Sequence, residues 1–265
     1  MFHILYQDSH RLIVQTHAGD FDKWGDDLYG EFNVALHVLD NNERVLSNRL
    51  ALLENLNKLN TSQPIQEIHW LNQIHGDNVV PIDKHQMSPP NADALITDKC
   101  GVGLSIMTAD CVPIALFNDG ARTHQSQIAC IHAGWQGLTK GVIKNTVSQF
   151  ETKPIKAVIG ACISQANYET DNTLANTIVQ SVIDNSLVDL FFDELYQQIV
   201  MDKSDGKCLM DIVKLTKLQL AHLDIELINH DVPCSYDVPN LYSYRQQTHA
   251  KKSATGRMAM MIAQF

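Results

Sequence analysis

Short apolar runs, bounded by polar and turn-forming residues, recur along the whole chain and constrain its fold more than any other feature. Runs of this length and composition are typical of β-strands. They come in clusters and do not alternate strictly with helical patterns. This arrangement favours an α+β fold with mixed sheets over a doubly wound parallel sheet. We expect strands over Phe2–Tyr6, Leu12–Thr16, Glu67–Leu71, Val79–Ile82, Ala94–Thr97, Val102–Thr108, Ile114–Asn118, Ile128–His132, Ala157–Ile159, Glu226–Ile228 and Met258–Ala263.

Helical patterns lie between these clusters. The clearest one begins at Asp40, where Glu43 follows three residues later and indicates a capping box. The expected buried stripe of this helix consists of Leu46, Leu50, Leu53 and Leu56. Further helices are expected from Gly137 onward and over the segments Leu174–Ile183, Leu187–Val200 and Cys208–Leu223.

Composition narrows the class of protein. The chain has 265 residues, of which 45% are hydrophobic, and no linker or repeat divides it, so we expect one catalytic domain over residues 1–265. A net charge of −10 with scattered Lys and Arg argues against a nucleic-acid partner. The N-terminus does not resemble a signal peptide, and no apolar stretch is long enough to span a membrane. Six cysteines without a CxxC pair are typical of reduced thiols, so a cytoplasmic location is expected.

The stretch TADCVPIAL, residues 108–116, places an acid and a thiol inside an apolar run. Pro113 cannot donate a hydrogen bond to a neighbouring strand, so we expect a bend at Cys111 with a new strand after it. Such a bend would direct Cys111 into a pocket. Asp110 could then orient a ligand or transfer a proton.

Two histidines occur in similar settings, at the ends of expected strands. His75 stands in NQIHGDNVV and His132 in IHAGWQGL. Together with Cys111 they supply the three nitrogen and sulfur ligands of a catalytic zinc site, with the fourth position left for water. Spacing alone also fits three unconnected residues, with Cys111 as buried packing and the histidines as ordinary core or surface groups.

Other residues could bind an anion or a ring. The GWQG stretch, which begins with Gly134, starts a helix whose free N–H groups favour an anion, although Trp135 could simply pack in the core. Near the C-terminus, Tyr244, Arg245 and Arg257 could contact a phosphate or a ring, or could belong to a loop that leads into a final strand.

The motifs together resemble one family, the YfiH/YlmD family, whose members are labelled polyphenol oxidases (laccases) and also purine nucleoside phosphorylases. The resemblance covers most of the chain and includes the motifs FNVALHV, NQIHG, NADALITD, TADCVPI, HAGWQG, NYE, YSYR and TGRMAMMI. It implies a four-layer α/β/β/α sandwich of mixed sheets. It also implies that His75, Cys111 and His132 are metal ligands.

The resemblance further implies chemistry on purine nucleosides: phosphorolysis of adenosine, inosine and methylthioadenosine, and deamination of adenosine. Zinc lowers the pKa of a bound water to about 7, so that hydroxide can attack C6 of adenine. Purine nucleosides and phosphate are therefore the expected partners. Matching motif positions suggest that Asn33, Arg49 and Gln73 contact substrate or phosphate.

The chain departs from the family pattern at several positions. Gln136 replaces the usual Arg of HAGWRG, YSYRQ replaces SYRR, and GACI replaces Gly-Pro-x-Ile. The Arg-Gly-Gly-Val-Ser stretch is replaced by HAGDFDKWGDDLYGEFN. Loss of two potential anion-binding arginines leaves the metal ligands intact, which favours hydrolytic chemistry over phosphate-dependent chemistry.

Three other functions stay open. A copper-dependent phenol oxidase would use copper at the same three ligands, because copper competes well at such sites. A metal-free cysteine hydrolase, acting on cell-wall peptide precursors, would use Cys111 as nucleophile and His75 or His132 as base. A purine-binding protein without activity would show no turnover of adenosine.

Overall fold

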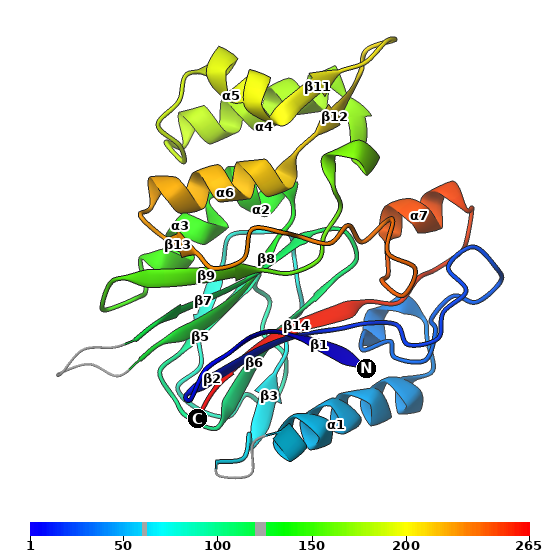
Figure 1. The fold of residues 1–265 in the computed structure, drawn as a ribbon, viewed down its shortest axis with the longest axis vertical. Coiled ribbons are helices and arrows are strands. Elements are labelled where there is room, and N and C mark those ends of the chain that lie inside the picture. Colours follow the sequence, from blue (N-terminus) through cyan, green and yellow to red (C-terminus); the bar gives the residue numbers. More distant parts are fainter. Residues whose placement is uncertain (60–62, 120–125) are drawn as a thin grey trace.

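Two large mixed sheets form the centre of the protein (Figure 1). The structure, a computed structural model, describes residues 1–59, 63–119 and 126–265. The five-stranded sheet contains, in spatial order, β1 (Phe2–Gln7), β2 (Arg11–Thr16), β14 (Met258–Gln264), β6 (Val102–Thr108) and β3 (Glu67–His69). The six-stranded sheet contains β13 (Glu226–Leu227), β9 (Ile155–Ile159), β7 (Val112–Asn118), β8 (Ile128–Ala133), β5 (Ala94–Thr97) and β4 (Val79–Pro81).

The two sheets pack face to face, and helices cover their outer faces. Ile106 and Ile262 of one sheet share a buried cluster with Phe117 and Val158 of the other. Helix α1 (Asn42–Leu59) covers the outer face of the five-stranded sheet. The outer face of the six-stranded sheet packs against α2 (Trp135–Lys140), α3 (Val142–Val147) and α6 (Ile212–His222), and α4 (Asn172–Asp184) packs on α2 from outside (Figure 1). Both sheets contain parallel and antiparallel pairs, so the prediction of a mixed α+β fold is confirmed.

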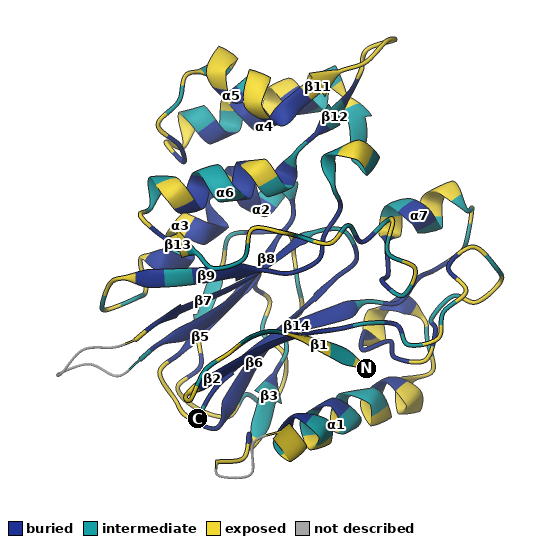
Figure 2. Ribbon diagram, viewed as in Figure 1, coloured by how far each residue is buried: buried dark blue, intermediate teal, exposed yellow. Residues whose placement is uncertain are grey.

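Burial explains why the central strands read as continuous apolar runs. Strand β7 lies between β8 and β9, and every one of its residues is buried (Figure 2). A strand that is covered on both faces gains from apolar side chains at every position. Pro113 lies inside this strand, where its carbonyl accepts a hydrogen bond from the N–H of Gly160. The bend expected at Cys111 is confirmed: it covers residues 109–111, with a φ of 95° at Asp110, and β7 begins directly after Cys111.

Helix α1 differs from its prediction in cap and in face. Asn41, not Asp40, caps the helix, since its side chain accepts the Arg44 N–H at 2.9 Å. Leu46 and Leu50 are more than half exposed, and the described side chains that pack under the helix are Val45, Leu52 and Leu56. The predicted stripe was therefore wrong at Leu46 and Leu50, because the sheet contacts the neighbouring side of the helix. Its other two members are confirmed, since Leu56 is fully buried and Leu53 packs partly buried against the same core.

A three-stranded sheet was not predicted. It consists of β10 (Glu169–Asp171), β12 (Lys207–Met210) and β11 (Val200–Asp202), and these strands are short and partly polar. The expected helix over Cys208–Leu223 begins only at Ile212, because Cys208 belongs to β12 and Asp211 caps the helix. The expected helix over Leu187–Val200 shortens to α5 (Phe192–Ile199).

The helix expected from Gly137 is interrupted. Gly141 has a φ of 86°, which ends α2 and starts α3 in a new direction. The remaining elements are η1 (Leu36–Val38), η2 (Gln165–Asn167) and α7 (Tyr244–His249). None of the helices in the described ranges is long and apolar enough to span a bilayer.

Candidate active site

The fold brings three distant side chains to one point. His75 lies in the loop after β3, Cys111 lies between β6 and β7, and His132 lies near the end of β8. Their ligand atoms all lie within 4.8 Å of one another, and Cys111 Sγ is 3.9 Å from His75 Nε2. The two imidazole rings are perpendicular, with centroids 4.7 Å apart. The sequence prediction that these three residues lie together agrees with this geometry.

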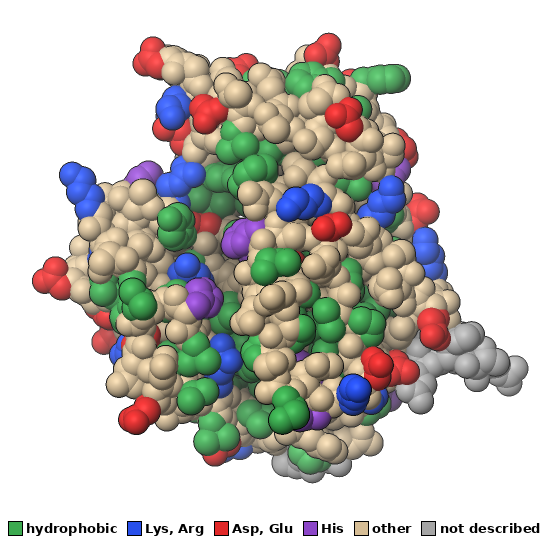
Figure 3. Space-filling model, turned by 180° about the vertical axis from the view of Figure 1, so that it is seen from behind, with side chains coloured by type: hydrophobic (Ala, Val, Ile, Leu, Met, Phe, Trp, Pro, Cys, Tyr) green, Lys and Arg blue, Asp and Glu red, His purple; other side chains and the backbone are tan. Residues whose placement is uncertain are grey.

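The cluster opens into a cavity of about 680 Å³. His75 is exposed, Cys111 is partly exposed and His132 is buried, so the cluster lies at the inner wall of this cavity. The space-filling view shows a face hollowed between the upper and lower parts of the molecule, with histidine and cationic side chains beside the hollow (Figure 3). A cavity of this size is typical of a site for a small organic molecule.

Asp93 fixes both histidines, and its role was not predicted. Its fully buried carboxylate accepts the Nδ1–H of His132 at 2.8 Å and the main-chain N–H groups of His75 at 3.0 Å and Gly76 at 2.6 Å. Nδ1 of His132 is thus occupied, and Nε2 is left for the cluster. A carboxylate behind a ligating histidine is a common arrangement in metal sites. The signal in the sequence was the motif NADALITD, to which no chemical role was assigned.

The thiol of Cys111 and the imidazole of His132 shift each other's pKa in opposite directions. Burial raises the pKa of the Cys111 thiol, but the imidazoles of His132 and His75 outweigh burial and lower it to about 6. Burial lowers the pKa of His132, but Cys111 and Asp93 outweigh it and raise it to about 9. Both shifts express the same attraction between a thiolate and an imidazolium. Without a metal, Cys111 is therefore a thiolate at neutral pH.

The cluster fits a metal ion in donor type and in space. Two imidazoles and a thiolate are ligands that zinc prefers, and a tetrahedral zinc site separates nitrogen and sulfur ligands by about 3.5 Å. The observed 3.9 Å between Sγ and Nε2 requires only a modest movement of side chains. Gly134 leaves room beside the cluster, because a Cβ there would lie 3.1 Å from His75 Cδ2 and 3.2 Å from Cys111 Sγ.

Asp110 lines the cavity, but both of its carboxylate oxygens are engaged. Oδ1 accepts the hydroxyl of Ser235 at 2.6 Å, and Oδ2 accepts the main-chain N–H of Arg245 at 2.6 Å. Its backbone has a positive φ, which is costly for a residue with a Cβ. The predicted proton-transfer role does not follow from this geometry, which instead gives Asp110 a role in holding the cavity wall.

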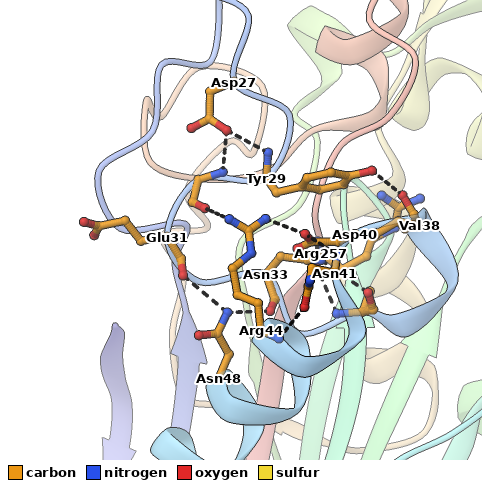
Figure 4. A network of polar contacts seen from close by, with 12 residues as sticks. Asp27, Tyr29, Glu31, Asn33, Val38, Asp40, Asn41, Arg44, Asn48 and Arg257 are labelled. Carbon is orange, nitrogen blue, oxygen red and sulfur yellow. Dashed lines mark hydrogen bonds and ion pairs between the residues drawn. The ribbon is translucent and has the colours of Figure 1, made fainter.

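Gln73 and Asn33 also hold main chain. The side-chain amide of Gln73 makes two 2.7 Å hydrogen bonds, one to the carbonyl and one to the N–H of Met107, at the cavity wall. Asn33 is fully buried and does not line the cavity. Its Oδ1 accepts the Arg257 N–H at 2.9 Å, within a polar network that includes Asp40 and Arg44 (Figure 4). Both residues position the site and leave little capacity to bind substrate.

Arg49 likewise lies outside the cavity lining. Its Nε donates to the Val34 carbonyl at 2.8 Å, and its guanidinium stacks 3.9 Å from the centre of the Trp70 ring. The hydrogen bond to Val34 holds the segment that precedes η1. Direct substrate contact by Arg49 or Asn33, as predicted, is not supported by their positions.

Gly134, Tyr244, Arg245 and Arg257 all line the cavity, as the sequence prediction required. Each arginine is held through Nη1. Arg245 donates from Nη1 to the carbonyls of Asn167 and Glu169, and Arg257 donates from Nη1 to those of Thr255 and Gly256. Neither is ion-paired with a carboxylate among the described residues, so both carry free positive charge at the cavity.

Among the lining residues that were not predicted, three have side chains suited to contact a ligand. Trp135 and Tyr168 add aromatic surface, and burial raises the pKa of Tyr168 to about 12, so its hydroxyl keeps its proton. His37 lies at the rim, where burial, Arg257 and Arg49 lower its pKa. The motif FNVALHV contained His37, but an isolated histidine gave no chemical signal by itself.

Comparison with known proteins agrees with these features. The family model described as multi-copper polyphenol oxidoreductase laccase matches residues 6–264. The chain belongs to this family. A relative from Shigella flexneri, named purine nucleoside phosphorylase YfiH, is 31% identical over 237 residues, covering 88% of this chain and 86% of that protein. One from Corynebacterium glutamicum, named purine nucleoside phosphorylase, is 28% identical over 260 residues, covering 95% and 93%.

Solved structures of the same kind share the fold. Protein NMB0706 from Neisseria meningitidis superposes with a TM-score of 0.76 at 25% identity, covering 99% of this chain and 98% of that one. YlmD from Geobacillus stearothermophilus gives a TM-score of 0.72 at 24% identity, covering 97% and 92%. The resemblance to the YfiH/YlmD family is thereby confirmed.

Proposed function

We propose that the chain is a metal-dependent purine nucleoside enzyme, which cleaves adenosine, inosine and methylthioadenosine by phosphorolysis and deaminates adenosine. One observation carries the proposal: the cluster of His75, Cys111 and His132 opens into a cavity that is also lined by two arginines without a carboxylate partner in the described part of the chain. The names of the relatives, purine nucleoside phosphorylases, support the same substrates. A cytoplasmic location would keep the six cysteines reduced, as the free thiols of the structure require.

We assign zinc to the cluster, with His75, Cys111 and His132 as its ligands. When bound, zinc would supply Lewis acidity to the cavity. Asp93 holds the Nδ1 proton of His132, so the ring presents Nε2 to the ion. Copper is the alternative metal, because thiolate and imidazole ligands also suit it.

Arg245 and Arg257 are the proposed phosphate ligands. Each uses Nη1 for main-chain carbonyls, so its Nε–Nη2 edge remains for two parallel hydrogen bonds to an oxyanion. In phosphorolysis a phosphate oxygen bonds to C1′ of the ribose, and the C1′–N9 bond breaks with its electrons leaving on the purine. Two guanidiniums would hold the anion against C1′ and lower the entropic part of the barrier.

The cavity favours phosphorolysis over deamination, which reverses the ranking from the sequence. Zinc deaminases use a free carboxylate as general acid and base. The described lining contains no glutamate, and the carboxylate of Asp110 is engaged by Ser235 and Arg245. Arg245 and Arg257 at the cavity supply positive charge for a phosphate, although Gln136 stands where the family pattern has an arginine.

The test is incubation of the zinc-loaded protein with adenosine, with and without phosphate. Adenine that forms only with phosphate marks phosphorolysis, and inosine in both samples marks deamination. We expect adenine to be the main product. Arg257→Gln should raise the KM for phosphate and leave any inosine formation unchanged. No turnover of any purine nucleoside by the zinc-loaded protein would contradict the proposal.

A second candidate, a metal-free cysteine hydrolase, is favoured by the low pKa of Cys111 beside two imidazoles. It predicts activity on peptide precursors that survives treatment with a chelator. A copper-dependent phenol oxidase, suggested by the family description, predicts phenol oxidation only after copper loading. Chelation followed by reloading with zinc or with copper separates these candidates from the proposed enzyme.

A further inference from the structure

Lys23 is a buried cation far from the cluster in sequence, and it forms no ion pair with an acidic side chain among the residues that the structure describes. Its side chain is hidden, with 3% of the residue exposed. Nζ donates to the carbonyls of Ser235 at 2.6 Å, Tyr236 at 3.0 Å and Val238 at 2.7 Å. An ammonium has three protons, so all of its donors are used. The acceptors are neutral main-chain carbonyls, and the ammonium holds the turn at residues 235–238 through them.

Burial of this charge is costly for stability. Burial lowers the pKa of Lys23 to about 8, against the weaker opposing effects of Asp110, Cys234 and Asp237. A buried cation without an ion pair rarely stabilises a fold more than an apolar side chain of the same size. Its position therefore calls for a role beyond stability.

The turn held by Lys23 leads directly to the cavity. The carbonyl of Ser235 accepts a hydrogen bond from Lys23, and the hydroxyl of Ser235 donates one to Asp110 Oδ1. Oδ2 of the same carboxylate accepts the main-chain N–H of Arg245 in the first turn of α7. Asp110 precedes the cluster residue Cys111 and has a strained backbone that these contacts stabilise.

A second contact connects Lys23 to the same helix. The side chain of Gln246, buried in α7, donates to the Lys23 carbonyl at 2.6 Å. Lys252 fixes the segment around Lys23 from outside, because its Nζ donates to the carbonyls of Asp22 and Asp27. This segment is the one that replaces the Arg-Gly-Gly-Val-Ser stretch of the family pattern.

We propose that Lys23 is a positioning residue for the reaction, which sets the place of Arg245 and of Asp110 through the turn at residues 235–238. This inference rests on the proposed function for its kinetic test. Lys23 does not line the cavity, and its protons are committed, so it takes no part in bond making. Its effect reaches the substrate through the free edge of the Arg245 guanidinium.

The test compares Lys23→Met with Lys217→Met. Methionine keeps most of the length of lysine and loses the donors. Among the described residues, Lys217 donates to one carbonyl, that of His230, and no hydrogen bond joins His230 to Asp110. Lys23→Met should raise the KM for phosphate about tenfold or more, as expected for a misplaced binding group. Its zinc content should stay at the wild-type value. Lys217→Met should match the wild type in both.

A double-mutant cycle with Ser235→Ala separates positioning from general loss of stability. If the effect passes through Ser235, the double variant is no worse than the poorer single variant, because contacts in one network do not add. Wild-type phosphate KM in Lys23→Met, or losses that multiply in the double variant, would overturn the inference. If Lys23→Met does not fold, Ser235→Ala alone decides: an unchanged phosphate KM overturns the proposal.

An assay without turnover distinguishes this inference from the proposed function. Hydrogen exchange of the Arg245 amide should be faster in Lys23→Met than in Lys217→Met, since its acceptor Asp110 is no longer held. If the wild type turns over no nucleoside, the function fails but this measurement still decides on Lys23. Equal exchange in the two variants would show that the turn does not control α7.

Discussion

At the scale of single residues, Asp93 is the centre of the site. One carboxylate holds the ring of His132 and the main chain of the loop that carries His75. Its burial would be costly without these partners, and their hydrogen bonds outweigh burial and lower its pKa. The geometry of two proposed ligands thus depends on one residue that touches neither substrate nor metal.

Replacing Asp93 should weaken metal binding without removing a ligand. We expect Asp93→Asn to lower zinc affinity by about 10- to 100-fold, the usual effect of losing a carboxylate behind a ligating histidine. Competition with a coloured chelator measures the affinity. Asp77→Asn is the matched control, because the carboxylate of Asp77, in the same loop as His75, accepts a hydrogen bond from Asn145 and not from a ligand residue. Equal zinc affinity in the wild type and Asp93→Asn would refute the role given to this carboxylate.

Cys111 provides the pH dependence at this scale. Because its pKa is lowered to about 6, the metal-free protein holds a thiolate above that pH and a less reactive thiol below it. Alkylation by iodoacetamide should therefore rise through a midpoint near pH 6 and should be blocked by zinc. Mass spectrometry of Cys111 and of the exposed Cys100 gives both rates in one sample. A midpoint above pH 8 at Cys111 would contradict the charge distribution of the cluster.

At the scale of elements, sequence patterns predicted the strands better than the helices. Strands of the central sheets, such as Val102–Thr108, are buried at every position and mostly apolar because both faces are covered, and this gives a strong local signal. The strands of the small sheet are short and partly polar, so their sequences give a weak strand signal. They form only because they pair with strands elsewhere in the chain, which a local sequence pattern does not reveal. Helix α1 has more leucines than its buried face needs, and the side that meets the sheet is decided by tertiary packing.

The corrected face of α1 can be checked by a pair of substitutions. Leu52→Ala removes a fully buried side chain and should lower the free energy of unfolding by about 2–5 kcal/mol. Leu50→Ala, two residues away and 57% exposed, should change it by less than about 0.5 kcal/mol. Urea denaturation of both variants gives the comparison. A larger loss for Leu50→Ala would restore the originally predicted stripe.

At the scale of the whole molecule, the sandwich explains why the site could be only partly predicted. The metal-binding character of imidazole and thiolate side chains identified His75, Cys111 and His132 in the sequence. The packed sheets bring these residues together from loops and strand ends. Asn33 and Arg49 were assigned to substrate from motif positions, but motifs do not distinguish residues that touch a ligand from residues that hold main chain. Asp93 and Lys23 act through contacts across the fold, which no local pattern reveals.

The central claim is that one metal ion is held by two imidazoles and one thiolate at the wall of the cavity. Cobalt titration of the metal-free protein tests it most directly, because a cobalt–thiolate bond gives a charge-transfer absorption band. We predict one cobalt ion per chain with this band in the wild type, and loss of the band in Cys111→Ser, while Cys100→Ser resembles the wild type. A band that persists in Cys111→Ser, or a wild type that binds no cobalt, would contradict the account.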